Sequence, residues 1–127
     1  MKIAIIGTNG FLSASIAKYA IERGWSLDMY GLDKPIHHTY THFYPLDLMQ
    51  GDIDVEELRK SDIIVYAVGA GIQSNLNESA ELIYALNVNA SVRICNALKQ
   101  AGYKGVFVTF GSYFELGEAD LHRPATE

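Results

Sequence analysis

The N-terminal segment, residues 1–24, constrains the fold of this chain more than any other. A short, continuously apolar and mostly β-branched run, Ile3-Ala4-Ile5-Ile6, stops at Gly7. Such a run is typical of a strand that helices cover on both faces. Beyond Gly10, apolar residues recur at helical spacing up to Gly24, which can end a helix in the left-handed conformation: Leu12, Ile16, Tyr19 and Ala20. The segment therefore predicts a buried strand, a glycine loop and a helix.

The rest of the chain continues this alternation, except that no crossover helix fits between the second and third strands. We expect further strands at residues 26–30, 42–46, 62–68 and 105–110, and helices at residues 52–58 and 77–101, the last one stopped by Gly102. Strands that alternate with helices imply a parallel sheet with right-handed crossovers. The prediction is an α/β fold: a Rossmann-type doubly wound parallel sheet with strand order 3-2-1-4-5 in a three-layer α/β/α arrangement. All of residues 1–127 belong to this one domain.

Length, charge and cysteine content exclude several classes of protein. The 127 residues suit one domain, and a net charge of −5 with scattered basic groups argues against a nucleic-acid partner. The longest apolar run, residues 63–68, is far shorter than the ~20 residues that span a bilayer. His37, His38 and His42 are expected at the surface, and Cys95 is expected as a packed thiol on a helix. We therefore expect a cytoplasmic protein with no bound metal and no membrane contact.

The glycine loop lies between the first strand and the first helix, the context in which such a pattern indicates dinucleotide binding. Gly7 can make the sharp turn, Gly10 can let the backbone approach a pyrophosphate, and the free amides of Phe11 and Leu12 can attract its charge. The sequence thus predicts an NAD or NADP site that includes Gly7, Thr8, Asn9, Gly10, Phe11 and Leu12. Ser13 replaces the third glycine of the fingerprint, which leaves close packing of the helix open. The alternative is that the glycines merely turn the chain.

The end of the second strand leaves the choice between NAD and NADP open. An acidic residue there favours NAD, and a nearby basic residue favours the 2′-phosphate of NADP. Counting about twenty residues from the loop reaches Asp33, whereas aligning the strand end at Tyr30 puts Gly31 in the acidic position. Lys34 follows and could meet a 2′-phosphate. Asp33 and Lys34 could equally be exposed turn residues.

Five segments carry a resemblance to a known family. They are Gly7-Thr8-Asn9-Gly10-Phe11-Leu12, Asp47-Leu48, Asn87-Val88-Asn89-Ala90-Ser91, Ser112-Tyr113-Phe114-Glu115-Leu116-Gly117 and Pro124-Ala125-Thr126-Glu127. The last three are similar to Asn-Val-x-Gly-Thr, Ser-x-x-x-Tyr-Gly and Pro-x-Thr-Glu. From end to end, the chain resembles the extended short-chain dehydrogenase/reductase group, the NAD-dependent epimerase/dehydratase family of nucleotide-sugar enzymes.

This resemblance implies roles for further residues. The family contacts adenine where Asp47 and Leu48 stand, and its catalytic serine falls on Ser112. We also count Asn87 as a cofactor residue, together with Val68 and Gly69 at the end of the fourth strand. In the family, a tyrosinate takes a hydroxyl proton while hydride moves to the nicotinamide, and a lysine lowers the tyrosine pKa. That Tyr-x-x-x-Lys motif would follow Glu127, and we interpret Tyr30-Gly31-Leu32-Asp33-Lys34 as a coincidence of spacing.

The expected function is therefore the NAD(P)-binding N-terminal portion of a nucleotide-sugar epimerase, dehydratase or reductase, inactive alone and without its substrate domain. Its partners would be a nucleotide-sugar substrate in the full-length protein and a second copy of the chain, as a dimer. An alternative is a non-catalytic NAD(P)-binding or sensing module that is complete at this length. A third hypothesis is a doubly wound signalling or scaffold domain that binds no nucleotide.

Overall fold

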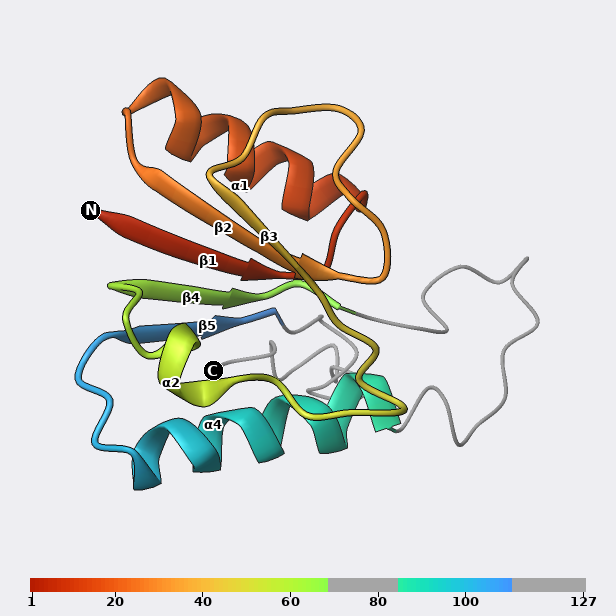
Figure 1. Ribbon diagram of the computed structural model, residues 1–127, viewed down its shortest axis with the longest axis vertical. Coiled ribbons are helices and arrows are strands. Elements are labelled where there is room, and N and C mark those ends of the chain that lie inside the picture. Colours follow the sequence, from red (N-terminus) through yellow and green to blue (C-terminus); the bar gives the residue numbers. More distant parts are fainter. Residues whose placement is uncertain (69–84, 111–127) are drawn as a thin grey trace, which may run out of the picture.

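The computed structural model describes residues 1–68 and 85–110, which form a parallel sheet with helices on both faces (Figure 1). The strands are β1 (Lys2–Ile6), β2 (Ser26–Gly31), β3 (His42–Pro45), β4 (Ile63–Tyr66) and β5 (Val106–Thr109). The helices are α1 (Phe11–Glu22), α2 (Val55–Leu58) and α4 (Ala90–Gln100), and a π-helical turn, η1 (Ala85–Asn89), comes directly before α4.

The five strands are all parallel and lie in the order β3-β2-β1-β4-β5, which confirms the predicted topology. In this order β1 is central, with Ile6 opposite Tyr30 on one side and Tyr66 on the other. The chain runs from β1 to β2 and β3 on one side and then crosses back from β3 to β4 on the other side of β1. The carboxyl ends of β1, β2 and β4 therefore meet at one edge, at the point where the strand order reverses.

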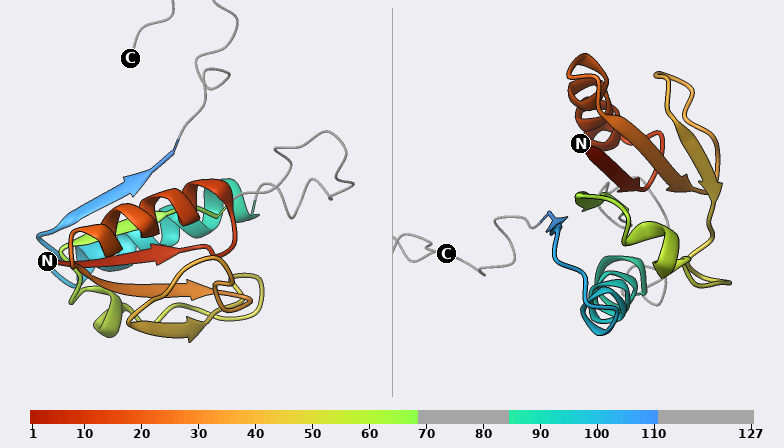
Figure 2. Two further views of the ribbon diagram at one scale, coloured as in Figure 1. Left: turned by 90° about the horizontal axis from the view of Figure 1, so that it is seen from above. Right: turned by 60° about the vertical axis from the view of Figure 1, so that its left-hand side comes forward.

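Helices cover the two faces of the sheet separately, in the three layers expected. Figure 1 shows α1 above the strands and α2 with α4 below them, and the right-hand view of Figure 2 shows α1 and α4 on opposite sides of the sheet. Two buried clusters fill the interfaces: Ile5, Met29 and Ala17 belong to the one under α1, and Ile64 and Leu98 to the one over α4. Each strand thus buries alternate side chains in different cores.

The buried face of α1 agrees with the predicted residues in part, because Ala20 is buried and Ile16 packs against the core under α1. Leu12 and Tyr19 are 45% and 49% exposed, whereas Ser13, Ala17 and Ala20 are buried. Small side chains let the helix lie close to the sheet, which the preceding glycine loop requires because it leaves little chain between β1 and α1. Apolar spacing alone favoured the larger residues on the neighbouring face.

Other elements agree with the expected positions, with shorter bounds. The helix expected at residues 52–58 is a single turn whose first amides are capped by the Asp54 side chain, which accepts from Glu57 N. The long helix expected from residue 77 is described only from Ala85, and its predicted core residues Ala90, Ile94 and Leu98 are buried. The prediction for Cys95 was wrong: its side chain is exposed. Throughout residues 1–68 and 85–110, no helix combines the length and the apolar character needed to cross a membrane.

Candidate functional site

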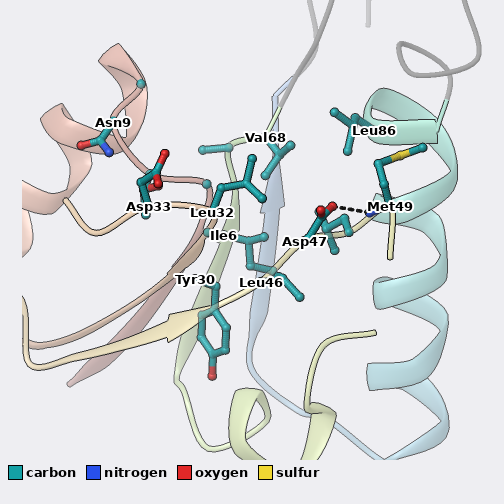
Figure 3. Close-up of a pocket in the computed structure, with 16 residues that line it drawn as sticks. Ile6, Asn9, Tyr30, Leu32, Asp33, Leu46, Asp47, Met49, Val68 and Leu86 are labelled. Atoms are coloured by element: carbon teal, nitrogen blue, oxygen red, sulfur yellow. Dashed lines mark hydrogen bonds between the residues drawn. The ribbon is translucent and has the colours of Figure 1, made fainter. Parts of the chain in front are cut away.

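A cavity of about 480 Å³ lies at the carboxyl edge of the sheet, where the strand order reverses. This is within the range of roughly 300–1,000 Å³ typical of small-molecule pockets. Its walls come from the ends of four strands and from η1 (Figure 3). They are formed by Ile6, Gly7, Thr8, Asn9, Gly10, Tyr30, Gly31, Leu32, Asp33, Leu46, Asp47, Leu48, Met49, Ala67, Val68 and Leu86. Segments far apart in the sequence therefore share one pocket.

The two glycines of the loop have different reasons to be glycine. Gly7 has a φ of +111°, and a Cβ there would lie 3.0 Å from the backbone C and O of Ala67. Its amide also donates to Tyr30 O at 2.7 Å, so packing within the protein fixes this position. Gly10 has an extended φ of −89°, and a Cβ there would meet only Ser13 Oγ, 3.9 Å away. The protein itself leaves the space beside Gly10 open.

The start of α1 presents amides to this space. Gly10 is the N-cap, no side chain caps the helix, and the first intrahelical bond runs from Ala14 N to Gly10 O at 3.0 Å. Within the described ranges, the amides of Phe11 and Leu12 have no acceptor. Free amides at the positive end of a helix dipole favour an anion. The side chains of Phe11 and Leu12 do not line the cavity, so only their backbone groups fit the predicted role.

Ser13 occupies the third glycine position of the fingerprint without loosening the packing there. Its side chain is 1% exposed, and its Oγ donates to Gly7 O at 2.8 Å. The hydroxyl thus gives the turning carbonyl of the loop a partner inside the protein. Close approach of α1 to β1 is kept with a serine, because the additional atoms are used in a hydrogen bond.

The turn after β2 is attached to the glycine loop. Asn9, at a left-handed φ of +61°, donates from Nδ2 to Lys34 O at 3.1 Å and accepts at Oδ1 from Ile36 N at 3.0 Å. Asp33, between these contacts and the strand end, lines the cavity, whereas Lys34 does not. Figure 3 shows Asn9 and Asp33 on one side of the pocket and Asp47 and Met49 across it.

The segment after β3 forms the opposite wall. Asp47 Oδ1 accepts from Met49 N at 3.0 Å, and Asp47 O accepts from the amides of Gln50 and Gly51. Leu48 O accepts from Arg93 Nη2, at 3.4 Å. The predicted pair Asp47 and Leu48 therefore lies in the pocket within a hydrogen-bonded turn. Sequence reasoning missed the apolar residues of the same walls, Leu32, Leu46, Met49 and Leu86, although Leu46 ends an expected strand and Leu32 lies two residues beyond another.

Two buried tyrosines lie beneath the pocket. Tyr30 is 2% exposed and its ring stacks on Tyr44 at a centroid distance of 4.7 Å. Burial raises the pKa of Tyr30 well above its ordinary value, and burial raises the pKa of Tyr66 to about 12. Tyr66 donates its phenolic proton to Leu86 O. Both phenols therefore stay neutral at physiological pH, which agrees with the interpretation that Tyr30 and Lys34 are no catalytic pair.

Three predicted site residues are not described in full. Gly69 and Ser112 lie outside the described residues, and Asn87 belongs to η1 without a description of its side chain. The predicted surface position of His42 is found, since its side chain is 58% exposed and contacts Asp28. In residues 1–68 and 85–110, no three His, Cys, Asp or Glu side chains gather as metal ligands would.

The sequence as a whole matches one family description: the NAD dependent epimerase/dehydratase family, over residues 3–127. The chain belongs to this family. No curated protein sequence matches this chain. The family membership agrees with the resemblance read from the glycine loop and the later motifs.

Solved structures share the fold of this epimerase/dehydratase family member. MoeE5 in complex with UDP-glucuronic acid and NAD has a TM-score of 0.75 and 20% identity, with 94% of this chain and 40% of that chain covered. ADP-L-glycero-D-manno-heptose-6-epimerase of Helicobacter pylori has a TM-score of 0.71 and 16% identity, with 94% and 41% covered. WbmG of Bordetella bronchiseptica, in complex with NAD and UDP, has a TM-score of 0.69 and 16% identity, with 96% and 41% covered. The chain spans about 40% of the length of each of these three.

Proposed function

We propose that this chain binds NAD or NADP at the carboxyl edge of its sheet, as the cofactor-binding portion of an enzyme that acts on nucleotide sugars. The observation that carries the proposal is the coincidence of three features at the carboxyl edge of the sheet. They are the open space beside Gly10, the free amides of Phe11 and Leu12, and the reversal of strand order between β1 and β4. A pyrophosphate over Gly10 would accept hydrogen bonds from these amides.

The rest of the cavity suits the adenosine half of a dinucleotide. Leu48, Met49 and Leu86 offer an apolar slot for a flat base, and the Asp47 turn places backbone groups at its border. Asp33 lies on the other wall, where a carboxylate can accept hydrogen bonds from ribose hydroxyls. The residues present therefore fit the cofactor that gives the family its name.

The chemistry of the whole protein is part of the same proposal. A bound nicotinamide supplies a hydride acceptor or donor. By resemblance, Ser112 would hold the oxygen of a sugar substrate, while Val68, Gly69 and Asn87 would border the nicotinamide half. The neighbours support nucleotide sugars as substrates, because MoeE5 is in complex with UDP-glucuronic acid and WbmG with UDP. A tyrosine and lysine pair would be needed in addition for turnover.

Calorimetric titration of the 127-residue chain with NAD, and separately with NADP, tests cofactor binding. The matched control is Gly10→Val, whose Cβ would lie in the space for the pyrophosphate, with Ser13 Oγ at 3.9 Å as its nearest protein atom. We expect at least one dinucleotide to bind and the variant to lose roughly 100-fold or more in affinity, about 2.7 kcal/mol. A folded chain that binds neither dinucleotide would overturn the proposal and favour a scaffold domain.

We further propose that the chain self-associates, as the family expectation of a dimer implies. In the described part of the sheet β5 pairs with β4 alone, and Val106 and Phe110 beside this edge are 57% and 46% exposed. An outer strand with apolar side chains is a ready surface for pairing. Sedimentation velocity over a wide concentration range should show a dimer, and a strictly monomeric profile would contradict the proposal.

A further inference from the structure

The apolar slot of the cavity is formed by two separate segments of the chain. Leu48 and Met49 belong to the turn after β3, and Leu86 belongs to η1. In Figure 3, Leu86 lies on the same side of the pocket as Met49. The width of the slot therefore depends on how the turn is held against η1, and neither segment determines it alone.

The turn at residues 47–52 is a unit with hydrogen bonds of its own. Asp47 Oδ1 accepts from Met49 N at 3.0 Å, and Asp47 O accepts from the amides of Gln50 and Gly51 at 3.1 and 3.0 Å. These bonds fix the shape of the turn. Its position relative to the helices depends on contacts with other elements.

Arg93 makes such a contact from α4. Its Nη2 donates to Leu48 O at 3.4 Å, and its Nε is 3.3 Å from Asp52 Oδ1. One guanidinium thus reaches two points of the turn, because its donors are spread over a planar fork. In residues 1–68 and 85–110, no other side chain from outside the turn hydrogen-bonds to residues 47–52 or forms an ion pair with them.

The second segment of the slot is held from the sheet and continues into the helix that carries Arg93. Tyr66 donates its phenolic proton to Leu86 O, and α4 begins at Ala90, directly after η1. Arg93 therefore attaches the turn to the same helical segment to which Leu86 belongs. Neither Tyr66 nor Arg93 lines the cavity. Both act on the slot through the carbonyl groups of residues that do line it.

We propose that Arg93 is a positioning residue for the adenine base: by joining the turn to α4, it holds Leu48 and Met49 at the distance from Leu86 that admits a flat ring. The inference rests on the proposed function, because it concerns the adenosine half of the same cavity. Arg93 and Asp52 are both exposed, so their ion pair contributes little to folding stability. Its effect is expected in ligand affinity.

The first test measures the affinities of the wild-type chain and of Arg93→Ala for NAD and for ADP-ribose by calorimetry. ADP-ribose has the same adenosine and pyrophosphate but lacks the nicotinamide. We expect the variant to bind both ligands roughly three- to fivefold more weakly, the size of one exposed ion pair. If the wild type prefers NADP, the 2′-phosphorylated forms of both ligands take their place.

Lys99→Ala is the matched control for the loss of charge. Lys99 lies in the last turn of α4, is exposed, and makes no contact with the turn at residues 47–52. The control removes one positive charge from the same helix. It should leave both affinities unchanged.

Asp52→Ala distinguishes positioning of the turn from direct attraction of the phosphates. If Arg93 acted through its charge on the ligand, loss of the Asp52 carboxylate would tighten the binding of an anion. If Arg93 positions the turn, Asp52→Ala removes one of its two contacts and should weaken both ligands by roughly twofold. The double variant should bind no more weakly than Arg93→Ala, because both substitutions remove the same contact. Arg93→Lys, which keeps the charge without the fork, should recover only part of the affinity.

The outcomes separate the two proposals. Binding of neither dinucleotide by the wild type overturns the proposed function and this inference with it. If a dinucleotide binds, four results overturn the inference alone: unchanged affinities in Arg93→Ala, a loss confined to the dinucleotide, tighter binding by Asp52→Ala, or full recovery in Arg93→Lys. A melting curve of each variant completes the test, because a merely structural role for Arg93 would lower the melting temperature and leave the affinities of the folded chain as they are.

Discussion

The two ends of the sheet use charged residues in opposite ways. Toward the amino ends of the strands, the fully buried Asp28 carboxylate is 3.1 Å from Lys2 Nζ and 3.0 Å from His42 Nδ1. At the carboxyl edge, Asp33 and Asp47 line a cavity to which residues 1–68 and 85–110 contribute no cation, and within the same ranges the amides of Phe11 and Leu12 have no acceptor. Charge that is compensated within the protein supports the fold, whereas charge and donors left uncompensated are available to a ligand.

Glu57 in α2 is a further carboxylate whose charge is balanced by neighbouring groups of the protein. Its carboxylate accepts from Lys60 Nζ at 2.9 Å and from Tyr44 OH at 3.1 Å. The hydrogen bond from Lys60 lowers the pKa of Glu57 below its ordinary value, and that from Tyr44 acts in the same direction. The short helix α2 is thereby attached to β3, an edge strand that pairs only with β2 in the described sheet.

The largest expected effect contrasts one aspartate from each end. Asp28→Ala leaves Lys2 and His42 without their buried partner, and should lower the free energy of unfolding by about 3 kcal/mol. Asp33→Ala should change it by less than about 0.5 kcal/mol, because surface substitutions usually do. Urea unfolding monitored by circular dichroism measures both. Equal losses of stability would break the distinction between the two ends.

A second contrast lies within the glycine loop. Gly7→Ala places a Cβ 3.0 Å from the Ala67 backbone at a left-handed φ, and should reduce the free energy of unfolding by about 2 kcal/mol. Gly10→Ala meets open space in an extended conformation, and its cost should stay below about 1 kcal/mol, the loss of a favourable N-cap. Thermal melts of the two variants measure both losses of stability. A larger loss in Gly10→Ala than in Gly7→Ala would contradict the assignment of Gly7 to packing and of Gly10 to the ligand.

Alkaline pH tests the buried phenol beneath the pocket. The pKa of Tyr66 is raised by burial to about 12, so the unfolded chain loses this proton first as the pH rises above 10. Folding stability from Tyr66 is complete below pH 10 and is lost between pH 10 and 12, by about 1.4 kcal/mol for each pKa unit. Urea unfolding at pH 9 and pH 11 should show the decrease. Tyr66→Phe should show a smaller one, and an identical decrease in both proteins would assign it to other groups, among them Tyr30.

The smallest expected effect concerns the serine in the third glycine position. Ser13→Ala removes the hydrogen bond to Gly7 O and should cost about 1 kcal/mol of unfolding free energy. Ser13→Gly restores the fingerprint glycine, and we expect it to be no more stable than Ser13→Ala. Chemical denaturation distinguishes the cases. A glycine variant more stable than the wild type would mean that the serine strains the contact between α1 and β1.

Much of the fold could be predicted because local patterns and topology agree. The apolar runs at residues 3–6 and 63–68 contain β1 and β4, and the alternation of strands with helices led to the strand order. Apolar spacing on α1 indicated Ala20 but not Ser13 and Ala17, because close packing selected these residues for their small size. Cys95 was misplaced for a related reason: its neighbour Ile94 faces the core, and adjacent helical residues point about 100° apart.

The candidate site was predictable where backbone conformation determines the residue type. Gly7 and Gly10 follow from the strand-loop-helix context, and Asp47 with Leu48 from the family resemblance, and all four line the cavity. Thr8 occupies the space beside Gly31, and the Asn9 side chain bonds to Lys34 O and Ile36 N; these residues are more than twenty positions apart, so no local pattern could reveal them. For the same reason, the sequence left Asp33 and Lys34 as equal alternatives.

Side chains at positions 8 and 31 compete for one volume at the pocket wall, because a Cβ on Gly31 would lie 2.6 Å from Thr8 Oγ1. A larger residue at position 31 would therefore require the Thr8 side chain to move. A smaller residue at position 8 would remove that requirement. The effect of a substitution at either position thus depends on the residue at the other.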